Sequence, residues 1–215
     1  MATNKLALVT GGSRGIGAAV CAGLRAAGWD VLAPTRAECD WADGDSVGKW
    51  WGDMGRGPFD AVVFVHGEWL SHPHVWSYHY NRQWRMRVLE PISILDEIFL
   101  EQRQAPPAVV FVSSTQAFGG RAETNAYAMA CAAQVRLALG LAQSGRCRAN
   151  VVCPGLTNTA MAAAVRASGD CRPDAVAQPP EAVAAAVLRL VTGDENGKVL
   201  RVVDGTVTEA KWMWA

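Results

Sequence analysis

The chain has 215 residues, half of them apolar, and its acidic and basic side chains balance to a formal net charge of zero. That length favours a single domain over residues 1–215, and the evenly spread charge argues against a nucleic-acid or anionic membrane surface. No apolar run is long enough to span a membrane and the N-terminus shows no secretory signal, so the expected location is cytoplasmic.

The cysteines and histidines form no recognisable metal-binding pattern. The six cysteines are scattered without CxxC pairs, which predicts reduced, mostly buried thiols and no disulfide framework. His72 and His74 flank Pro73, which is incompatible with a regular helix, and no carboxylate lies at a matching spacing. The sequence therefore predicts no metal site.

The first strand is expected over Lys5–Val9, and it runs into a glycine-rich loop before a helix over 18–28. In the loop, Gly11, Gly15 and Gly17 follow the spacing GxxxGxG. Residues without a Cβ let backbone amides and the positive end of the helix approach a pyrophosphate. Between a strand and a helix, this motif predicts a dinucleotide-binding loop; the alternative is an ordinary glycine-rich turn.

The second strand, expected over 31–33, indicates which dinucleotide the loop binds. In dinucleotide-binding folds the end of this strand meets the adenosine ribose, and here no acidic residue stands at its tip. The first charged residue after it is Arg36, and Arg14 lies in the glycine loop. These two cations favour the 2′-phosphate of NADP, with a solvent-exposed surface arginine as the alternative interpretation of Arg36.

Strands and helices alternate along the rest of the chain. Strands are expected over 59–66, 108–112, 148–152 and 199–203, and helices over 43–54, 82–104, 125–143 and 182–191. Pro91 is expected to interrupt one helix, and residues 157–180 to form a mobile segment with one short helix. Little room remains for a further strand between residues 33 and 43. The alternation predicts an α/β fold: a doubly wound, three-layer sandwich around a parallel sheet, or Rossmann fold.

These landmarks make the chain resemble the short-chain dehydrogenase/reductase family over nearly its full length. Thr10–Gly17 matches the family's TGxxxGxG cofactor loop, and Asp40 matches the acid that binds the adenine amino group. Pro154–Gly155 and Thr159 match the PGxxxT segment, which holds the nicotinamide carboxamide. The resemblance implies that NADP(H) is bound by Gly11, Ser13, Arg14, Gly15, Ile16, Gly17, Arg36, Asp40, Trp41, His66, Gly67, Pro154, Gly155, Thr157 and Thr159.

The catalytic motifs of the family are only partly present. Ser114 matches the catalytic serine, and Tyr127 follows it at the family's spacing of thirteen positions. The family's YxxxK motif places a lysine where this chain has Cys131. The residues 65–67 read Val-His-Gly in place of the family's Asn-Ala-Gly, and residues 89–91 read Leu-Glu-Pro where an asparagine normally interrupts the helix. Serine and tyrosine alone remain of the usual Asn-Ser-Tyr-Lys tetrad.

The missing lysine predicts a reductase. Without a neighbouring cation, the pKa of Tyr127 should stay near its ordinary value of about 10, so the phenol is protonated at neutral pH. Such a phenol can give a proton to a developing alkoxide but is a poor base. We therefore expect NADP(H)-dependent reduction of a ketone or aldehyde in a small molecule, with Tyr127 as general acid and Ser114 positioning the carbonyl oxygen. Restoring the lysine with Cys131→Lys should then raise alcohol oxidation.

Other interpretations of these residues stay open. An intact cofactor loop beside a depleted tetrad also suits a catalytically impaired relative that binds NADP as a structural or regulatory ligand, or a non-redox isomerase. His66 is a candidate proton carrier because histidine titrates near neutrality, or else a histidine that fills the strand end. Trp69 and Trp76 are either substrate contacts or packing residues. The family resemblance implies a homodimer or homotetramer.

Overall fold

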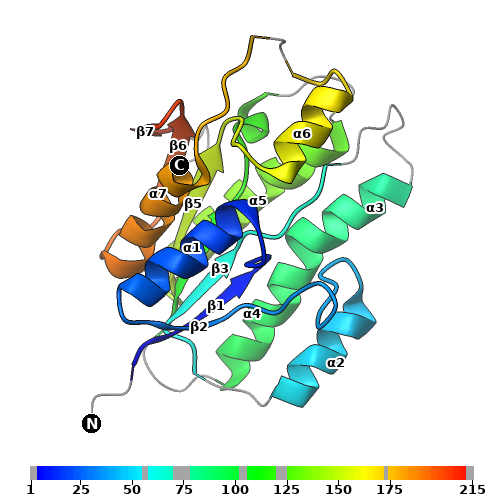
Figure 1. The fold of residues 1–215 in the computed structure, drawn as a ribbon. Coiled ribbons are helices and arrows are strands. Elements are labelled where there is room, and N and C mark those ends of the chain that lie inside the picture. Colours follow the sequence, from blue (N-terminus) through cyan, green and yellow to red (C-terminus); the bar gives the residue numbers. More distant parts are fainter. Residues whose placement is uncertain are drawn as a thin grey trace.

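The computed structural model describes residues 4–54, 58–69, 78–101, 106–119, 125–171 and 174–211, which form a seven-stranded sheet flanked by helices (Figure 1). The strand order is β2-β1-β3-β4-β5-β6-β7, and every neighbouring pair is parallel except β6 with β7. The strands are β1 (Leu6–Thr10), β2 (Asp30–Leu32), β3 (Ala61–Phe64), β4 (Ala108–Val112), β5 (Arg148–Pro154), β6 (Val199–Val203) and β7 (Thr206–Glu209).

The helices cover both faces of the sheet. They are α1 (Gly15–Ala26), α2 (Gly44–Met54), α3 (Tyr78–Trp84), α4 (Glu90–Glu101), α5 (Asn125–Ser144), α6 (Ala160–Ala167) and α7 (Pro180–Thr192). A π-helical segment, η1 (Arg85–Leu89), joins α3 to α4, and a 3-10 turn, η2 (Thr115–Phe118), follows β4. Among the described residues, no helix combines the length and the apolar character needed to cross a bilayer.

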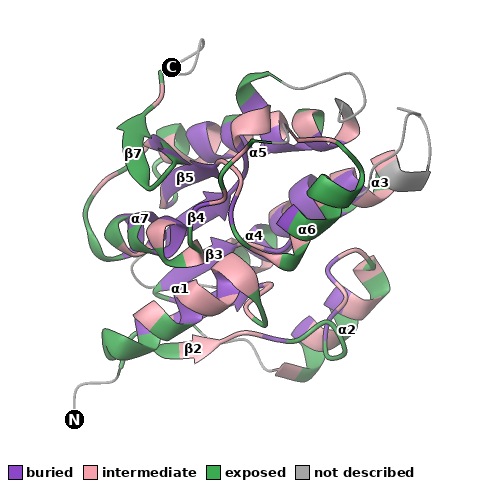
Figure 2. Ribbon diagram, turned by 45° about the horizontal axis from the view of Figure 1, so that its top comes forward, coloured by how far each residue is buried: buried purple, intermediate pink, exposed green. Residues whose placement is uncertain are grey.

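Each face of the sheet has its own hydrophobic core. On one face the apolar side chains of α1 and α7, such as Leu24 and Val187, pack on alternate strand residues. On the other face α2, α4 and α5 pack on the intervening strand residues, with Trp51, Ile94 and Val135 at the centre. Figure 2 shows the buried strands between helices whose outer surfaces are exposed. This confirms the predicted three-layer α/β architecture.

The boundaries differ from the sequence expectations at a few informative places. No strand lies between β2 and α2 in the described chain, as the short spacing predicts. The antiparallel strand β7 was not expected, although Asp204 and Gly205, both at positive φ, make the tight turn that forms a β6–β7 hairpin.

The long helix expected over 82–104 is interrupted earlier than predicted. Pro91 sits in the first turn of α4, where a missing N–H costs nothing, and the interruption is the π-helical η1 just before it. A π-helical turn is wider than an α-helical one and turns the following side chains onto a different face. Such segments are frequent at functional sites, and η1 contributes a side chain to the site described next.

Candidate active site and cofactor cleft

Two connected pockets lie at the carboxyl ends of the parallel strands, where the strand-to-helix loops meet. The first has a volume of about 320 Å³ and the second of about 600 Å³. They share a boundary formed by Ile16, Val65, Trp69, Thr159 and Met161. In an open α/β sheet this edge is the usual place for a ligand, because the loops there are free of the sheet hydrogen bonds. We call the first the reaction pocket and the second the nucleotide pocket.

The glycine loop forms one wall of the nucleotide pocket. Gly11 has a φ of +69°, and a Cβ there would lie 2.7 Å from the Cα of His66, so residue 11 must be glycine. A Cβ on Gly17 would overlap the carbonyl of Gly11, and one on Gly15 would lie 2.9 Å from the Thr159 side chain. The loop therefore packs tightly against His66 and Thr159, with no room for a side chain at these glycines.

The N-terminus of α1 is open to that pocket. Its N-cap residue is Arg14, whose side chain makes no capping hydrogen bond, and no acidic residue lies in the first turn. The amides at the start of a helix carry partial positive charge and bind phosphate when no side chain satisfies them. The residues present therefore fit the pyrophosphate of a dinucleotide.

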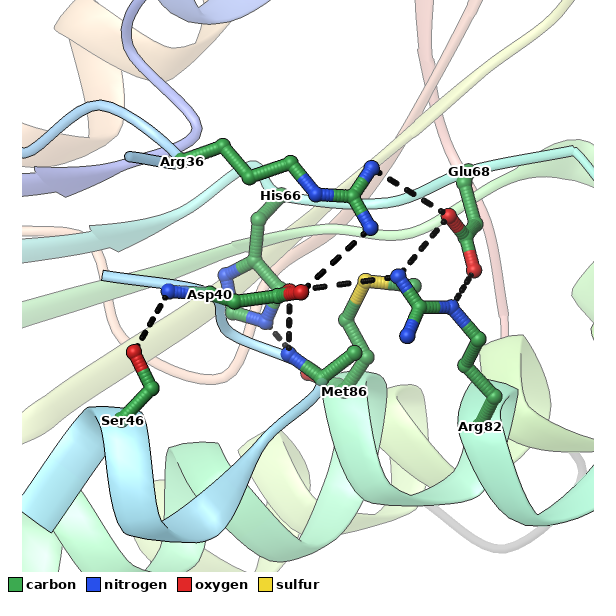
Figure 3. Close-up of polar contacts among 8 residues, drawn as sticks. Arg36, Asp40, Ser46, His66, Glu68, Arg82 and Met86 are labelled. Atoms are coloured by element: carbon green, nitrogen blue, oxygen red, sulfur yellow. Dashed lines mark hydrogen bonds and ion pairs between the residues drawn. The ribbon is translucent and has the colours of Figure 1, made fainter. Parts of the chain in front are cut away.

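A network of four charged side chains lies along one wall of the nucleotide pocket (Figure 3). Arg36, whose side chain is 63% exposed, lies 3.4 Å from an Asp40 carboxylate oxygen and 3.8 Å from one of Glu68. Arg82, from α3, is paired closely with Glu68 and lies 3.9 Å from Asp40. Because both carboxylates already hold arginines, an anion entering here would compete with them for the guanidinium groups.

Asp40 is also fixed by the backbone around it. Its backbone amide donates to the Ser46 hydroxyl at 3.0 Å (Figure 3), and its carboxylate accepts from the amide of Ala42 at 3.1 Å. The neighbouring Trp41 is buried and stacks on the His66 ring with a centroid distance of 5.3 Å. These contacts hold the segment at the wall of the nucleotide pocket.

His66 is bound within the fold through both ring nitrogens. Nε2 donates to the carbonyl of Met86 (Figure 3), and Nδ1 bonds the Thr10 hydroxyl. Burial lowers its pKa to about 4, so the ring is neutral at physiological pH. The expectation that His66 titrates near neutrality is therefore wrong, and desolvation is the reason. Its position in the pocket wall is compatible with a contact to the cofactor.

Ser114 and Tyr127 meet in the reaction pocket. Ser114 ends the β4 region and caps η2 by accepting the amide of Gln116 at 3.2 Å. Its hydroxyl donates to the oxygen of Tyr127, whose own hydroxyl donates to the sulfur of Cys131. Burial raises the pKa of Tyr127 to about 12, further than the sequence argument expected. At neutral pH the Tyr127 phenol is therefore protonated, and both hydroxyls can donate to a substrate oxygen once they turn from these partners.

A buried arginine that the sequence motifs did not indicate lies beside Tyr127. Arg87, from η1, is buried and lines the reaction pocket, with its guanidinium carbon 4.5 Å from the centre of the Tyr127 ring. In sequence it is a basic residue three positions after Trp84 and next to Val88, on a helix whose apolar stripe gives no reason to expect a buried charge. The structure places it in the π-helical turn, where it is buried.

The PGxxxT segment borders the reaction pocket. Pro154 ends β5, and Thr157 donates to the carbonyl of Gly155 at 3.1 Å while accepting from the Gln178 amide. Thr159 caps α6 by accepting the amide of Ala162 at 3.3 Å. The segment is thus rigidly held beside Tyr127 by contacts from two later parts of the chain.

Every residue that the sequence proposed for catalysis or cofactor binding borders one of the two pockets. The residues of the cleft that it did not propose include Glu68, Arg82, Arg87 and Met161. Trp69 borders both pockets and meets the Tyr127 ring edge-on at 5.3 Å, whereas Trp76 lies outside the described residues. Within the described ranges, no three histidine, cysteine or acidic side chains come together as metal ligands would.

Comparisons with known proteins agree with this geometry. The model of the NAD dependent epimerase/dehydratase family matches residues 7–156. No curated protein matches the sequence. A solved short chain dehydrogenase family protein from Francisella tularensis subsp. tularensis SCHU S4 has 18% identity and a TM-score of 0.79, with 94% of this chain and 98% of that chain covered.

Two further similar solved structures are complexes with a nicotinamide nucleotide. The 3-alpha-hydroxysteroid dehydrogenase from Pseudomonas sp. B-0831, complexed with NADH, is 24% identical with a TM-score of 0.77, and 94% of this chain and 96% of that chain are covered. A small-chain dehydrogenase in complex with NADPH is 21% identical with a TM-score of 0.77, and 94% of this chain and 98% of that chain are covered. At these identities the likeness establishes the fold.

Proposed function

Because the chain belongs to the NAD-dependent epimerase/dehydratase family and has the short-chain dehydrogenase/reductase fold, we propose that it is an NADP(H)-dependent carbonyl reductase. Its substrate is a ketone or aldehyde of a small molecule. The observation that carries the proposal is the meeting of Ser114 and Tyr127 in a pocket that shares a wall with the glycine-loop pocket. Two hydroxyl donors thus face the space next to the dinucleotide site.

The side chains of the reaction pocket supply the hydrogen bonds and the proton that a carbonyl reduction needs. A bound nicotinamide nucleotide supplies the hydride that adds to the carbonyl carbon. Tyr127 and Ser114 donate hydrogen bonds to the carbonyl oxygen as negative charge develops on it, and the Tyr127 proton moves to that oxygen. The C=O group becomes CH–OH, and the resulting phenolate takes a proton back from water. This direction suits a tyrosine that is protonated at neutral pH.

Arg14 and Arg36 support the preference for NADP(H). Both border the nucleotide pocket, and Arg36 stands just after the second strand with most of its side chain exposed. An arginine can bind the two extra charges of a 2′-phosphate through paired N–H groups. The structural neighbours include complexes with NADH and with NADPH, so the preference rests on these two arginines.

A second candidate function is cofactor binding without turnover. The raised pKa of Tyr127 and the cysteine at position 131 favour it, because both weaken proton transfer relative to an intact tetrad. In that case NADP(H) would act as a structural or regulatory ligand.

Isothermal titration with NADPH and NADH, followed by a carbonyl panel monitored through NADPH absorbance, separates these functions. We expect NADPH to bind about 10- to 100-fold more tightly than NADH, which is the value of one or two hydrogen bonds between charged groups. Tyr127→Phe should lower turnover by about 100-fold or more. Tyr80→Phe, on α3 outside both pockets, is the matched control and should leave turnover unchanged.

Tight NADPH binding without turnover on any carbonyl would favour the second function. Failure to bind either nucleotide would refute both.

A further inference from the structure

A buried arginine without a carboxylate partner is the unusual feature of the reaction pocket. Arg87 is 2% exposed, and its guanidinium donates to the side-chain oxygens of Gln83 and Gln134, each at 3.2 Å. In the described chain, no Asp or Glu oxygen lies within 4.0 Å of it. A buried charge held only by neutral amides is costly unless another anion balances it at some stage of the working cycle.

The fold is arranged to keep this guanidinium beside Tyr127. Gln134 lies seven residues after Tyr127 on α5, so the two share a helix face, and Gln83 lies one turn before Arg87. Opposite them, a Cβ on Gly67 would overlap the Arg87 guanidinium, so the close approach depends on glycine at position 67. The guanidinium then packs over the face of the Tyr127 ring at 4.5 Å.

We propose that Arg87 is the cation of this active site, and that it stabilises the negative charge left on Tyr127 when its proton passes to the substrate oxygen. The inference rests on the proposed reductase function. It assigns to a residue of η1 the electrostatic role that the family resemblance gives to a lysine at position 131.

Several physical properties fit this role. Of the cations near the ring, Arg87 is the one whose charge lowers the pKa of Tyr127, and it also acts in the same direction on Cys131. In the resting site, burial raises the pKa of Tyr127 more than the Arg87 charge lowers it, so the phenol stays protonated until its proton passes to the substrate oxygen. A guanidinium cannot lose its own proton, so the positive charge is present at every pH at which the protein is folded.

The position of Arg87 makes it a positioning residue rather than a copy of the lysine. Its guanidinium stacks on the ring face and is held by two glutamines, so it stabilises charge through space and fixes the ring plane. Glu68, a carboxylate whose charge also acts on it, is already bound to Arg82 and Arg36 in the adjoining pocket.

The test is a direct titration of Tyr127 in the protein without cofactor. Tyrosine is replaced biosynthetically by 3,5-difluorotyrosine, whose phenol is more acidic and titrates while the protein is still folded. The Tyr127 signal in the fluorine NMR spectrum is assigned with Tyr127→Phe. We expect Arg87→Met to raise the apparent pKa of this residue by about one unit or more, and Arg87→Lys to restore most of the wild-type value.

Arg136→Gln is the matched control, because Arg136 is an exposed arginine on the same helix as Tyr127 and borders neither pocket. It should leave the titration unchanged. Circular dichroism and thermal melting of each variant show that it is folded. If Arg87→Met does not fold, Gln134→Met is the second probe, because it removes one of the two amides that hold the guanidinium over the Tyr127 ring. An unchanged Tyr127 titration in Arg87→Met, or in Gln134→Met, would overturn the proposal.

Kinetics provide the second measurement. Arg87→Met should lower kcat for carbonyl reduction by about tenfold or more while the Kd for NADPH stays within about twofold, because the residue lies in the reaction pocket and outside the nucleotide pocket. A loss confined to NADPH binding would contradict the role. If the wild-type protein does not turn over, the proposed function fails, but the titration still decides whether Arg87 acts on Tyr127.

Discussion

The most direct prediction from the reaction pocket concerns the pH dependence of the two reaction directions. Burial raises the pKa of Tyr127 to about 12, two units above the ordinary value for tyrosine, which corresponds to about 2.7 kcal/mol in favour of the phenol. The general acid for reduction is therefore fully protonated from pH 7 to 10, whereas the general base for oxidation amounts to only about one molecule in 1,000 at pH 9.

The two directions should respond differently when kcat/KM is measured across pH 7 to 10.5. Carbonyl reduction should show no loss from Tyr127 deprotonation, and alcohol oxidation should rise about tenfold per pH unit without levelling off. Tyr127→Phe should abolish the rise, which ties it to this phenol. A reduction rate that falls above pH 8, or an oxidation rate that reaches a plateau below pH 9, would show that the tyrosine pKa is several units lower and would refute the reasoning.

Three further predictions follow from other contacts in the cleft. Arg36→Ala should weaken NADPH binding by about tenfold or more and leave NADH binding within about twofold, as measured by calorimetry; equal losses for both would contradict the 2′-phosphate role. The wild-type protein should lose about 3 kcal/mol of unfolding free energy as the pH falls from about 6.5 to 4, because the unfolded chain binds a proton at His66 while the folded chain keeps this ring neutral. His66→Gln should not show this loss. Denaturant titrations at both pH values compare the two proteins, and equal pH profiles would refute it. Cys131→Lys should cost about 3 kcal/mol of stability, since it buries an ammonium close to the Arg87 guanidinium, and combining it with Arg87→Met should recover part of that loss in thermal melts.

Most of the fold follows from the sequence because its signals are local and strong. The strand β4 is an unbroken apolar run that is buried in the sheet. The strand β6 is apolar except for the exposed Arg201, and the bounds of both strands agree with the prediction. The helix α5 was placed to within a residue at its C-terminus. The exposed strand β7 was missed because Thr206–Glu209 alternates threonine with other residues and has no apolar face, so only its Asp-Gly turn indicated a hairpin.

The glycine loop was predictable for the same reason. Gly11, Gly15 and Gly17 are needed because a Cβ at each would overlap a neighbouring atom. The three glycines lie in one short motif, so the sequence alone reveals this requirement. The charged network was harder to predict from the sequence, because Glu68 lies in a loop, Arg82 lies on α3, and the two meet only through the packing of this helix. No spacing rule connects them.

The sequence argument about the missing lysine was local, and this is why it reached only half of the answer. It identified Cys131 as the departure and predicted a protonated tyrosine, and it named His66 as a candidate proton carrier, but it named no cation in place of the lysine. A 3.6-residue periodicity cannot anticipate the π-helical turn at 85–89, and an apolar stripe gives no reason to expect that Arg87, within this turn, is buried. The same turn alters what Cys131→Lys should do: the position beside it already contains a buried cation, so a second one adds repulsion. An active site whose positive charge comes from η1 rather than from α5 should depend on Gly67 and Gln134 as well as on Tyr127, because these residues keep the guanidinium over the ring.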